Sequence, residues 1–372
     1  MRFYVASHRF YAGIDLHART LHLCILDEAG HVVCDQNLPC RPDAVLAALS
    51  PFRDGLVVGV ECMFAWYWLA DLCQQHGIPF VLGHALYMKA IHGGKAKNDR
   101  IDAGKIARLL RGGTFPLAYA YPKPMRATRD LLRRRTYLVR QRAALLTHLQ
   151  ILNSQYNLAP FGKSLSGARQ RADLDIANRF DDPSARHSAQ LDLELAQHFD
   201  AAIDAVERYL IQTAQVDDVQ TYARLQTIPG VGRVLGLVLL YELHDSGRFA
   251  NAGQLLSYAR LVRCLHESAG KKHGSGNPKI GNAHLRWAFA EAACGMLAQS
   301  ERARRWKERQ AARRGAGKAL AILAARLARA VYHMLRKGEV FDETRFWQGR
   351  DGGAAVTGSS SLSPKEATHA GH

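Results

Sequence analysis

A strand, a helix and a second strand follow one another between residues 55 and 82, and this run constrains the fold more than any other part of the chain. The segment GLVVGV (55–60) is short and continuously apolar, which is typical of a strand buried on both faces. A helix predicted for residues 64–76 stops at Gly77, and IPFVL (78–82) supplies the next strand. Because this unit requires a parallel crossover, the N-terminal region is predicted to be α/β.

The segments on either side of this unit add a hairpin and a second helix. Residues 11–26 are apolar and β-branched, with partial alternation, and are predicted to form one strand. The turn signal DEAG (27–30) then leads into a returning strand, HVVCDQNL. A further helix is predicted for residues 99–111, ended by two glycines. This order is that of the ribonuclease-H-like (RuvC-like) architecture, although other α/β folds share parts of it, and we place the domain at residues 1–122.

The remainder of the chain is predicted to be mainly helical. Residues 125–156 and 188–216 have leucines and other apolar residues at helical spacing, and we expect them to pair as an antiparallel arm or coiled coil that brings chains together. The stretch between them is polar and irregular. The last 26 or so residues are rich in Gly, Ser and Thr with almost no apolar content, which predicts disorder. The predicted parts are therefore a helical arm (123–218), a mainly helical C-terminal domain (219–346) and a tail (347–372).

The charge of the chain indicates a polyanionic partner. With 372 residues, a net charge of +17 and a hydrophobic fraction of 48%, this is a globular chain of more than one domain that is expected to meet nucleic acid, with a membrane surface as the competing polyanion. No apolar run is long enough to span a bilayer, and the N-terminus lacks the apolar core of a secretory signal. Seven scattered Cys without a C-x-x-C pair favour free thiols in a reducing compartment, so we expect a cytoplasmic, nucleoid-associated protein and no membrane partner.

Four acidic residues are candidates for a metal site. Asp15 lies inside an apolar strand, and Glu61 follows VVGV at the end of a predicted parallel strand, where ligands bind in open α/β sheets. Asp99 and Asp102 are three apart on a helix and share a face, about 60° apart. Four converging carboxylates would repel one another, and Mg²⁺ relieves this repulsion because it prefers oxygen ligands. The simpler interpretations are an exposed edge-strand acid for Asp15, a helix-start acid for Glu61, and a helix cap with a first-turn acid for the last two.

Basic residues and a glycine turn are candidates for phosphate binding. The motif IPGVG (228–232) lies between apolar helical runs, which suits a helix-hairpin-helix whose exposed N–H groups hold a phosphate, although an ordinary turn between helices has the same pattern. Two arginine-rich stretches, 126–142 and 302–318, are either nucleic-acid surfaces or solvated helix faces. The residues predicted to contact nucleic acid are Lys97, Arg100, Lys105, Arg133, Arg134, Gly230, Gly232, Lys271, Lys272 and Lys279.

Two serines are candidate nucleophiles. Ser268, in HESAGKKHG, lies among lysines that would bind phosphate and stabilise an alkoxide, and Ser275 is an equal candidate by that argument. Most serines in glycine-rich loops are turn residues, and on these residues alone that interpretation is the stronger one.

The motifs GIDLH, VGVE, KNDRIDAGKIA, IPGVG, ESAG and KIGNAHLRWAF, in this order, resemble those of a known family. It comprises insertion-sequence transposases with an N-terminal DEDD, RuvC-like domain and a C-terminal serine transposase domain, the bridge-RNA-guided recombinases. The resemblance runs from about Tyr11 to Phe341 and implies that Asp15, Glu61, Asp99 and Asp102 bind Mg²⁺. It also implies that Ser268 is the nucleophile that forms a covalent link to a DNA end, although the loop between ESAG and KIGN aligns only with a gap.

The same resemblance implies the partners. These are donor and target DNA, a guide (bridge) RNA, and further copies of the chain in a dimer or tetramer with composite sites. We therefore expect a Mg²⁺-dependent DNA transposase that cuts and rejoins strands. Two alternatives stay open: a metal-dependent, Holliday-junction-resolvase-like nuclease that uses water, and a non-catalytic nucleic-acid-binding protein.

Overall fold

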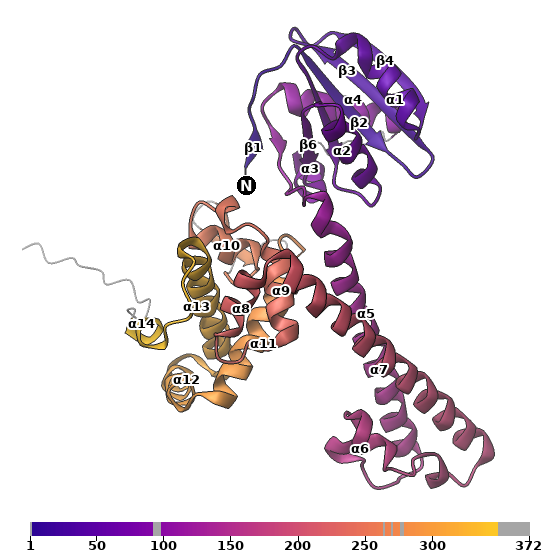
Figure 1. Ribbon diagram of the computed structural model, residues 1–372, viewed down its shortest axis with the longest axis vertical. Coiled ribbons are helices and arrows are strands. Elements are labelled where there is room, and N and C mark those ends of the chain that lie inside the picture. The colour runs from indigo at the N-terminus through magenta and orange to yellow at the C-terminus, as the bar shows by residue number, and fades with distance from the viewer. Residues whose placement is uncertain (1, 92–97, 263–264, 269–270, 276–278, 349–372) are drawn as a thin grey trace, which may run out of the picture. The chain divides into compact units, whose positions relative to one another are not determined.

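The structure, a computed structural model, describes residues 2–91, 98–262, 265–268, 271–275 and 279–348 (Figure 1). The backbone divides into two compact units. The first contains Met1–Asp217 and Cys264–Gly281, and the second contains Asp218–Arg263 and Asn282–His372. The N-terminal region is mixed α/β and the C-terminal part is largely helical.

A five-stranded sheet with the order β4-β3-β2-β5-β6 forms the centre of the N-terminal region. Strands β2, β3 and β4 form an antiparallel meander, and β5 and β6 run parallel to β2, so the predicted parallel crossover is confirmed. A separate antiparallel pair joins β1 and β7. The strands are β1 (Phe3–Tyr4), β2 (Phe10–Leu16), β3 (Thr20–Asp27), β4 (Val32–Pro39), β5 (Leu56–Glu61), β6 (Phe80–Gly83) and β7 (Phe115–Pro116).

The prediction of one strand over residues 11–26 is wrong. The structure has two strands there, β2 and β3, joined by a tight turn in which His17 N–H donates to the Thr20 carbonyl at 3.0 Å. The turn contains no Gly, Pro, Asn or Asp, so the usual turn signal is absent from the sequence. The predicted DEAG turn is present between β3 and β4, and the meander has one strand more than expected.

Helices cover both faces of this sheet. On one face, α1 (Pro42–Leu49) and α2 (Trp66–Gln75) pack on the side chains of Ile14 and Val60. On the other face lies α4 (Asp99–Arg111), which packs against β2, β3 and β5. The predicted helices 64–76 and 99–111 are thus confirmed within two residues, whereas α1 and α3 (Ala85–Ile91) had not been predicted.

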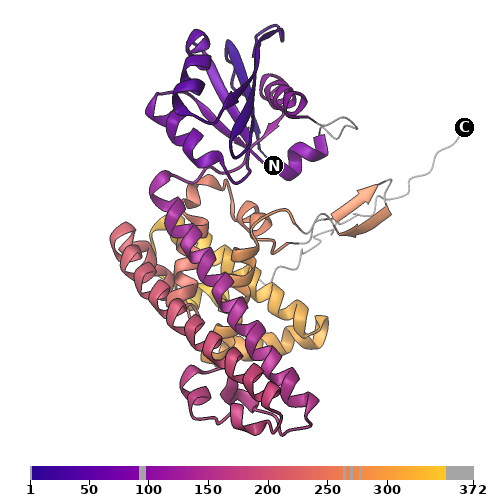
Figure 2. The ribbon, with the colours of Figure 1, turned by 90° about the vertical axis from the view of Figure 1, so that its right-hand side faces the viewer.

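Two long antiparallel helices, α5 (Lys123–Gln155) and α7 (Pro183–Asp217), form the predicted arm and lie side by side (Figure 2). Ion pairs along their seam fix the antiparallel direction: Arg135 Nη2 with Glu207 Oε1 at 2.6 Å, and Arg142 Nη1 with Asp200 Oδ1 at 2.5 Å. The stretch between the helices is not simply irregular. It contains the short α6 (Ala168–Ala172) and buries its own apolar cluster, which includes Phe161, Leu165, Ile176 and Phe180.

The arm is fixed at its root to the sheet region. Arg126 at the start of α5 is buried, and its guanidinium donates to the Tyr121 carbonyl at 2.6 Å and to Asp71 Oδ1 at 2.7 Å. The same guanidinium stacks on the ring of Trp66, 4.7 Å from its centroid. A charge buried in this way is stable because it is both paired and hydrogen-bonded.

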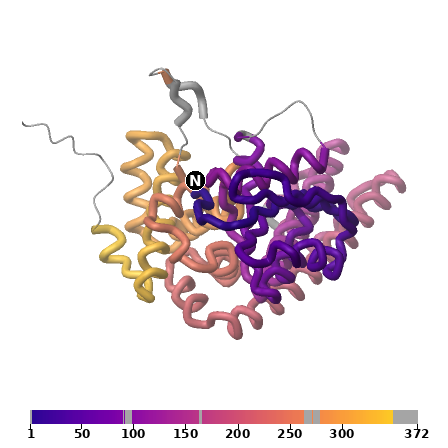
Figure 3. The backbone as a smooth tube through the Cα atoms, turned by 90° about the horizontal axis from the view of Figure 1, so that it is seen from above, coloured from indigo at the N-terminus to yellow at the C-terminus, as the bar shows by residue number. Residues whose placement is uncertain are grey.

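The second unit is a bundle of helices around the almost wholly buried α9. α12 and α13 lie side by side within it (Figure 3). Its helices are α8 (Val219–Gln226), α9 (Arg233–Leu243), α10 (Ala252–Tyr258), α11 (Ala283–Gln299), α12 (Glu301–Arg314), α13 (Ala316–Lys337) and α14 (Glu343–Gln348). No helix of the described residues combines the length and the apolar character that crossing a membrane requires. The predicted tail, 347–372, lies outside the described residues from 349 onwards.

Candidate active site

Asp15 and Glu61 lie at the carboxyl ends of two neighbouring parallel strands. The last paired residues of β2 and β5 are Ile14 and Val60, so the next residue on each strand is an acid. Neighbouring strands are about 4.8 Å apart, and residues level with one another on a parallel pair face the same side of the sheet. The predicted placement of the two acids at one strand edge is therefore what the register gives.

Two glycines bring α4 onto this face of the sheet. Gly13 and Gly59 are paired with each other, each two residues before an acid, so their missing side chains would point to the same side as Asp15 and Glu61. A Cβ atom on Gly13 would lie far inside 3.0 Å of backbone atoms of Ala103 and Ala107. The absence of side chains here lets the first turn of α4 reach the strand ends.

The first turn of α4 presents Asp99 and Asp102. The interpretation of Asp99 as the helix cap is wrong, because Asn98 is the N-cap and its Oδ1 accepts from Ile101 N–H at 2.8 Å. Both acids lie in the first turn, where a carboxylate is favoured by the helix dipole. Because Asn98 caps the helix, the Asp99 carboxylate is not used as a cap. The Asp99 side chain is 59% exposed.

Asp15, His17 and Asp99 form a compact group. His17 Nε2 lies 3.3 Å from Asp15 Oδ2 and 3.3 Å from Asp99 Oδ1, and one ligand atom from each residue falls within 4.8 Å of the others. His17 was not among the predicted site residues. The signal for it was present, because D-x-H at the end of a strand places the two side chains on one face.

The electrostatics of the group favour a cation. Partial burial raises the pKa of Asp15; His17 opposes that rise, and the charges of Asp99 and Asp102 add to it. Among the described residues, the one cation paired with Asp102 is Lys105, whose Nζ lies 2.9 Å from Oδ1. Carboxylate oxygens with a partly open surface and an excess of negative charge fit a divalent metal ion. The structure thus brings two of the four predicted acids, Asp15 and Asp99, together with His17. Asp102 lies in the same first turn of α4, and Glu61 lies at the end of the neighbouring strand.

The basic residues predicted to contact phosphate differ in whether they already pair with a carboxylate. Arg100 Nε pairs with Asp35 Oδ2 at 2.6 Å, and Lys105 is held by Asp102, so both charges already have a carboxylate partner. Arg134 is exposed and stacks on Tyr137, 4.6 Å from its centroid. Lys97 lies outside the described residues.

Two arginines of the basic helix α5 act on the residue that follows Glu61. Desolvation raises the pKa of the Cys62 thiol, although the residue is exposed by surface area, and the charges of Arg129 and Arg133 act against this rise. Both guanidinium groups are therefore close to the residue that follows Glu61. Arg133 was among the predicted contacts, and Arg129 was identified only by the structure.

The IPGVG turn joins α8 to α9, as predicted, and its two glycines differ. Gly230 has φ +88° and packs on the backbone of Gly295 and Met296 in α11, and its N–H donates to Gln299 Oε1 at 3.1 Å. Gly232 is the N-cap of α9, and a Cβ there would meet nothing within 4 Å. An incoming phosphate would therefore find open space at Gly232, whereas the N–H of Gly230 is already used.

The two candidate serines lie on a β-hairpin. Strands β8 (Leu265–Ser268) and β9 (Lys271–Ser275) pair antiparallel, with Ser268 opposite Lys271 and Leu265 opposite Ser275. Ser268 therefore ends β8 next to the turn, and Ser275 ends β9 at the base of the hairpin. The side chains of both serines and of Lys272 lie outside the described residues, while Lys271 and Lys279 are exposed.

The ends of the segment that carries this hairpin are tied together in the second unit. Asn282 N–H donates to the Tyr258 carbonyl at 2.6 Å, which joins the end of α10 to the start of α11. Asn282 also caps α11 and donates from Nδ2 to Glu242 Oε2 at 2.7 Å; Glu242 is 1% exposed. These contacts join the start of α11 to the end of α10 and to α9.

Comparison with known proteins agrees with these features. A DEDD transposase model of the IS110 type, described as "Transposase", matches residues 12–157, which include all four acids. A second model, "Transposase IS116/IS110/IS902 family", matches residues 222–310, which include IPGVG and the serine hairpin. The chain belongs to the IS110 family of insertion-sequence transposases.

Relatives of this transposase cover nearly its whole length. The transposase for insertion sequence element IS1111A of Coxiella burnetii is 25% identical over 336 residues, covering 88% of this chain and 90% of that protein. The transposase for IS1328 of Yersinia enterocolitica is 23% identical and covers 89% and 98%. The IS110 insertion element protein of Streptomyces coelicolor is 33% identical over 122 residues, 32% of this chain and 29% of that protein. The chain is accordingly a DNA transposase, a DNA recombination enzyme.

Proposed function

We propose that this transposase cuts and rejoins DNA with a Mg²⁺-binding acidic tetrad and a nucleophilic serine, and that its N-terminal domain is ribonuclease-H-like. The observation that carries the proposal is the meeting of Asp15 and Asp99, residues far apart in sequence, within one group of metal-ligating atoms. Three antiparallel strands followed by two parallel ones, with α4 across one face, support the RuvC-like assignment.

Within this proposal each acid has a defined task. Asp15 and Glu61 would hold the ion from the strand ends, and Asp99 and Asp102 would hold it from the first turn of α4. Lys105 keeps Asp102 oriented through its 2.9 Å ion pair. Bound Mg²⁺ would supply charge stabilisation for the oxygens around a reacting phosphate.

The serine would supply the covalent step. Its Oγ attacks a backbone phosphorus, a phosphoserine bond forms to one DNA end, and the bond to the leaving oxygen breaks. The serine proton ends on that oxygen, which becomes a free hydroxyl. Attack by a hydroxyl of the incoming strand reverses the step and rejoins the DNA. The place of Ser268 beside the hairpin turn supports it over Ser275, which is at the base opposite Leu265.

Further parts of the proposal concern partners and organisation. The net charge of +17 and the basic face of α5 suit a guide RNA as well as donor and target DNA. The long arm suits assembly of a dimer or tetramer, and the chain would act in the bacterial cytoplasm beside the nucleoid. The division into a RuvC-like domain (1–122), an arm (123–218), a serine transposase domain with a helix-hairpin-helix (219–346) and a tail (347–372) stays a prediction.

The test is a recombination assay with donor and target plasmids and the nucleic acid that co-purifies with the protein. Wild type is expected to give recombined product and a protein–DNA adduct that survives denaturation. Ser268→Ala should abolish both, Ser275→Ala should retain both, and Asp15→Asn should abolish cutting. If the co-purified nucleic acid is digested with ribonuclease and activity persists, the RNA-guided part of the proposal is wrong.

A resolvase-like nuclease is the second candidate, because all four acids lie on the sheet strands and on helix α4, and hydrolysis by water requires no serine. Cutting that survives in Ser268→Ala without any covalent adduct would favour it. A protein in which Asp15→Asn changes nothing, while arginine substitutions in 126–142 weaken binding, would instead be a non-catalytic nucleic-acid-binding protein.

A further inference from the structure

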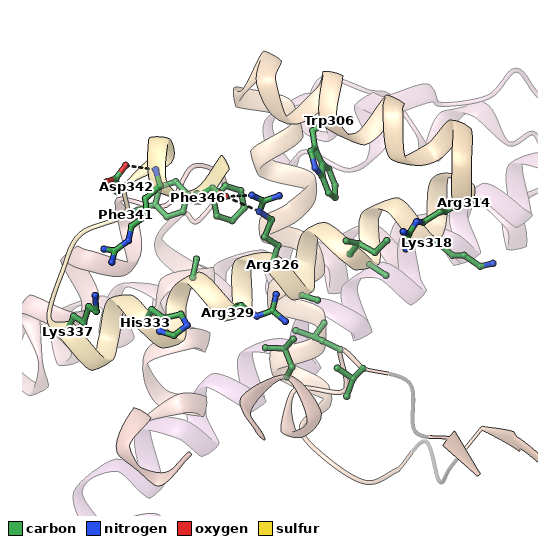
Figure 4. Close-up of a pocket in the computed structure, with 18 residues that line it drawn as sticks. Trp306, Arg314, Lys318, Arg326, Arg329, His333, Lys337, Phe341, Asp342 and Phe346 are labelled. Atoms are coloured by element: carbon green, nitrogen blue, oxygen red, sulfur yellow. Dashed lines mark hydrogen bonds between the residues drawn. The ribbon is translucent and has the colours of Figure 1, made fainter. Parts of the chain in front are cut away.

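A groove of about 1150 Å³ runs along α13 in the second unit (Figure 4). α13 forms its floor, and its walls come from α12, from the chain around α14 and from the end of α10. The arginine-rich stretch 302–318 contributes Trp306, Arg314 and Lys318 to the lining, and none of the candidate metal ligands or serines lines the groove. Its lining combines cations with apolar side chains, and this combination identifies the kind of ligand it suits.

Basic side chains form a stripe along α13. Lys318, Arg329, His333 and Lys337 line the groove at spacings of eleven, four and four residues, which keeps them on one face of the helix. The three at the C-terminal end are exposed and follow one another at one per turn, about 6 Å apart along the axis. Lys318, Arg329 and Lys337 have no carboxylate partner among the described residues, so their charges are available to a ligand.

The apolar part of the groove lies between these charges. Ile322 and Ala325 occupy the same face of α13 between Lys318 and Arg329. At one end stand Phe341 and Phe346. Figure 4 shows Trp306 reaching down from α12 toward α13.

The aromatic end is rigid. Arg326 donates from Nε to the Phe346 carbonyl at 2.9 Å and stacks on the Phe346 ring, 5.0 Å from its centroid. Trp306 and Trp347 lie 6.0 Å apart between ring centroids. The one acid that lines the groove, Asp342, accepts from Arg345 N–H at 3.0 Å and so is engaged in the start of α14.

We propose that this groove binds a single-stranded segment of nucleic acid, with successive phosphates along the α13 stripe and unstacked bases against the apolar floor and the aromatic end. A row of unpaired cations selects a polyanion, and apolar and aromatic surface between them selects one with exposed π-faces. In a duplex the bases are stacked and paired, so they cannot enter the groove. Leu261 and Val262 line the groove and precede β8 by a few residues in the chain.

The experiment uses the full chain without metal, so that binding is measured independently of cutting and of the acidic tetrad. A fluorescein-labelled DNA strand of about 20 nucleotides, longer than common single-strand site sizes, is titrated by anisotropy at several salt concentrations. Arg329→Glu with Lys337→Glu is compared with Arg313→Glu with Arg336→Glu. The control pair lies on α12 and α13, is exposed like the groove pair, makes the same change in charge and does not line the groove.

The groove pair is expected to weaken binding by about tenfold or more and to reduce the salt slope by about 1.4, the value for two lost contacts to single-strand phosphates. The control pair should change affinity by less than about threefold. Ala325→Trp, which fills the floor and leaves the charge unchanged, should weaken single-strand binding and leave binding of the matching duplex as it was. Equal melting temperatures of the variants would show that the fold is intact.

Three results would overturn the proposal. The first is equal loss in the groove and control pairs, which would reduce the effect to general electrostatics. The second is an equal effect of Ala325→Trp on single strand and duplex. The third is binding of a Glu-rich amphipathic helical peptide that the groove pair abolishes while oligonucleotide binding is unaffected, since the occupant would then be an acidic protein segment.

Discussion

The close packing of α4 on Gly13 makes a prediction that links stability to the acidic site. In Gly13→Ala the new methyl group would lie far inside 3.0 Å of the backbone of Ala103 and Ala107, a separation that real Cβ atoms do not show. The obstacle is backbone on both sides, so no rotamer change can relieve it. α4 must retreat from the sheet, and it carries Asp99 and Asp102 with it.

Overpacking of this kind typically costs about 1–3 kcal/mol, and the required shift is on the order of 1 Å. Misplacement of reacting groups by about 1 Å can cost about a hundredfold in rate. Gly104→Ala on α4 is the matched control. Its Cβ would meet only the end of the flexible Arg108 side chain at 3.4 Å, and replacing an interior helix glycine by Ala stabilises by about 1 kcal/mol.

The two variants should therefore move in opposite directions. Urea unfolding followed by circular dichroism is expected to show a lower midpoint for Gly13→Ala and a higher one for Gly104→Ala. Thermal melts with and without Mg²⁺ should show a smaller metal-induced shift in Gly13→Ala only. Unchanged stability and an unchanged response to Mg²⁺ in Gly13→Ala would refute the claim that this glycine sets the position of α4.

Three further predictions concern single side chains. Asp15→Asn should raise the melting temperature of the metal-free protein by a few degrees, because it removes a half-buried charge near other carboxylates. The variant should also lose most of the stabilisation by Mg²⁺, which is roughly 2.7 kcal/mol for a ligand at a hundred times its Kd. Asn282→Ala should cost about 2–4 kcal/mol in urea unfolding, since the buried Glu242 loses a partner along with the cap, whereas the exposed cap variant Asn251→Ala should cost about 1 kcal/mol. Burial lowers the pKa of His84, so the unfolded chain binds more protons than the folded one, and the free energy of unfolding should fall as pH drops below about 6.5. In His84→Gln the urea midpoint should depend less on pH between pH 7.5 and pH 5.

How much of the fold the sequence predicts depends on how strongly each segment is patterned. The run 55–60, the helix 99–111 and the two arm helices have an apolar pattern and clear stop signals, and all are present. The turn that begins at His17 contains none of the residue types that usually form turns, so the sequence predicts a continuous strand there. α1 was missed although Pro42 at its start and Asp43 in its first turn are typical helix-start signals.

The acidic residues of the candidate site can be singled out in the sequence, whereas their geometry cannot. An acid at the end of an apolar strand is costly without a partner, which singled out Asp15 from sequence. That Asp99 is the residue that approaches it depends on backbone contacts at Gly13, and contacts between distant segments leave no local pattern. The same holds for the Gly230 turn, whose N–H was expected to face a phosphate and instead meets Gln299.

The spacing of glycine and acid on β2 and β5 explains why one site can be both tightly built and open. Gly13 and Gly59 each precede an acid by two residues. On both strands, therefore, the glycine on which α4 packs is followed on the same face of the sheet by a carboxylate. The helix can then pack on the glycines while its first turn overhangs the acids, and the repulsion among the carboxylates is the part of the arrangement that packing does not relieve. That residual repulsion is what a divalent ion would offset, and it follows that substitutions at the glycines should weaken metal binding without removing a single ligand.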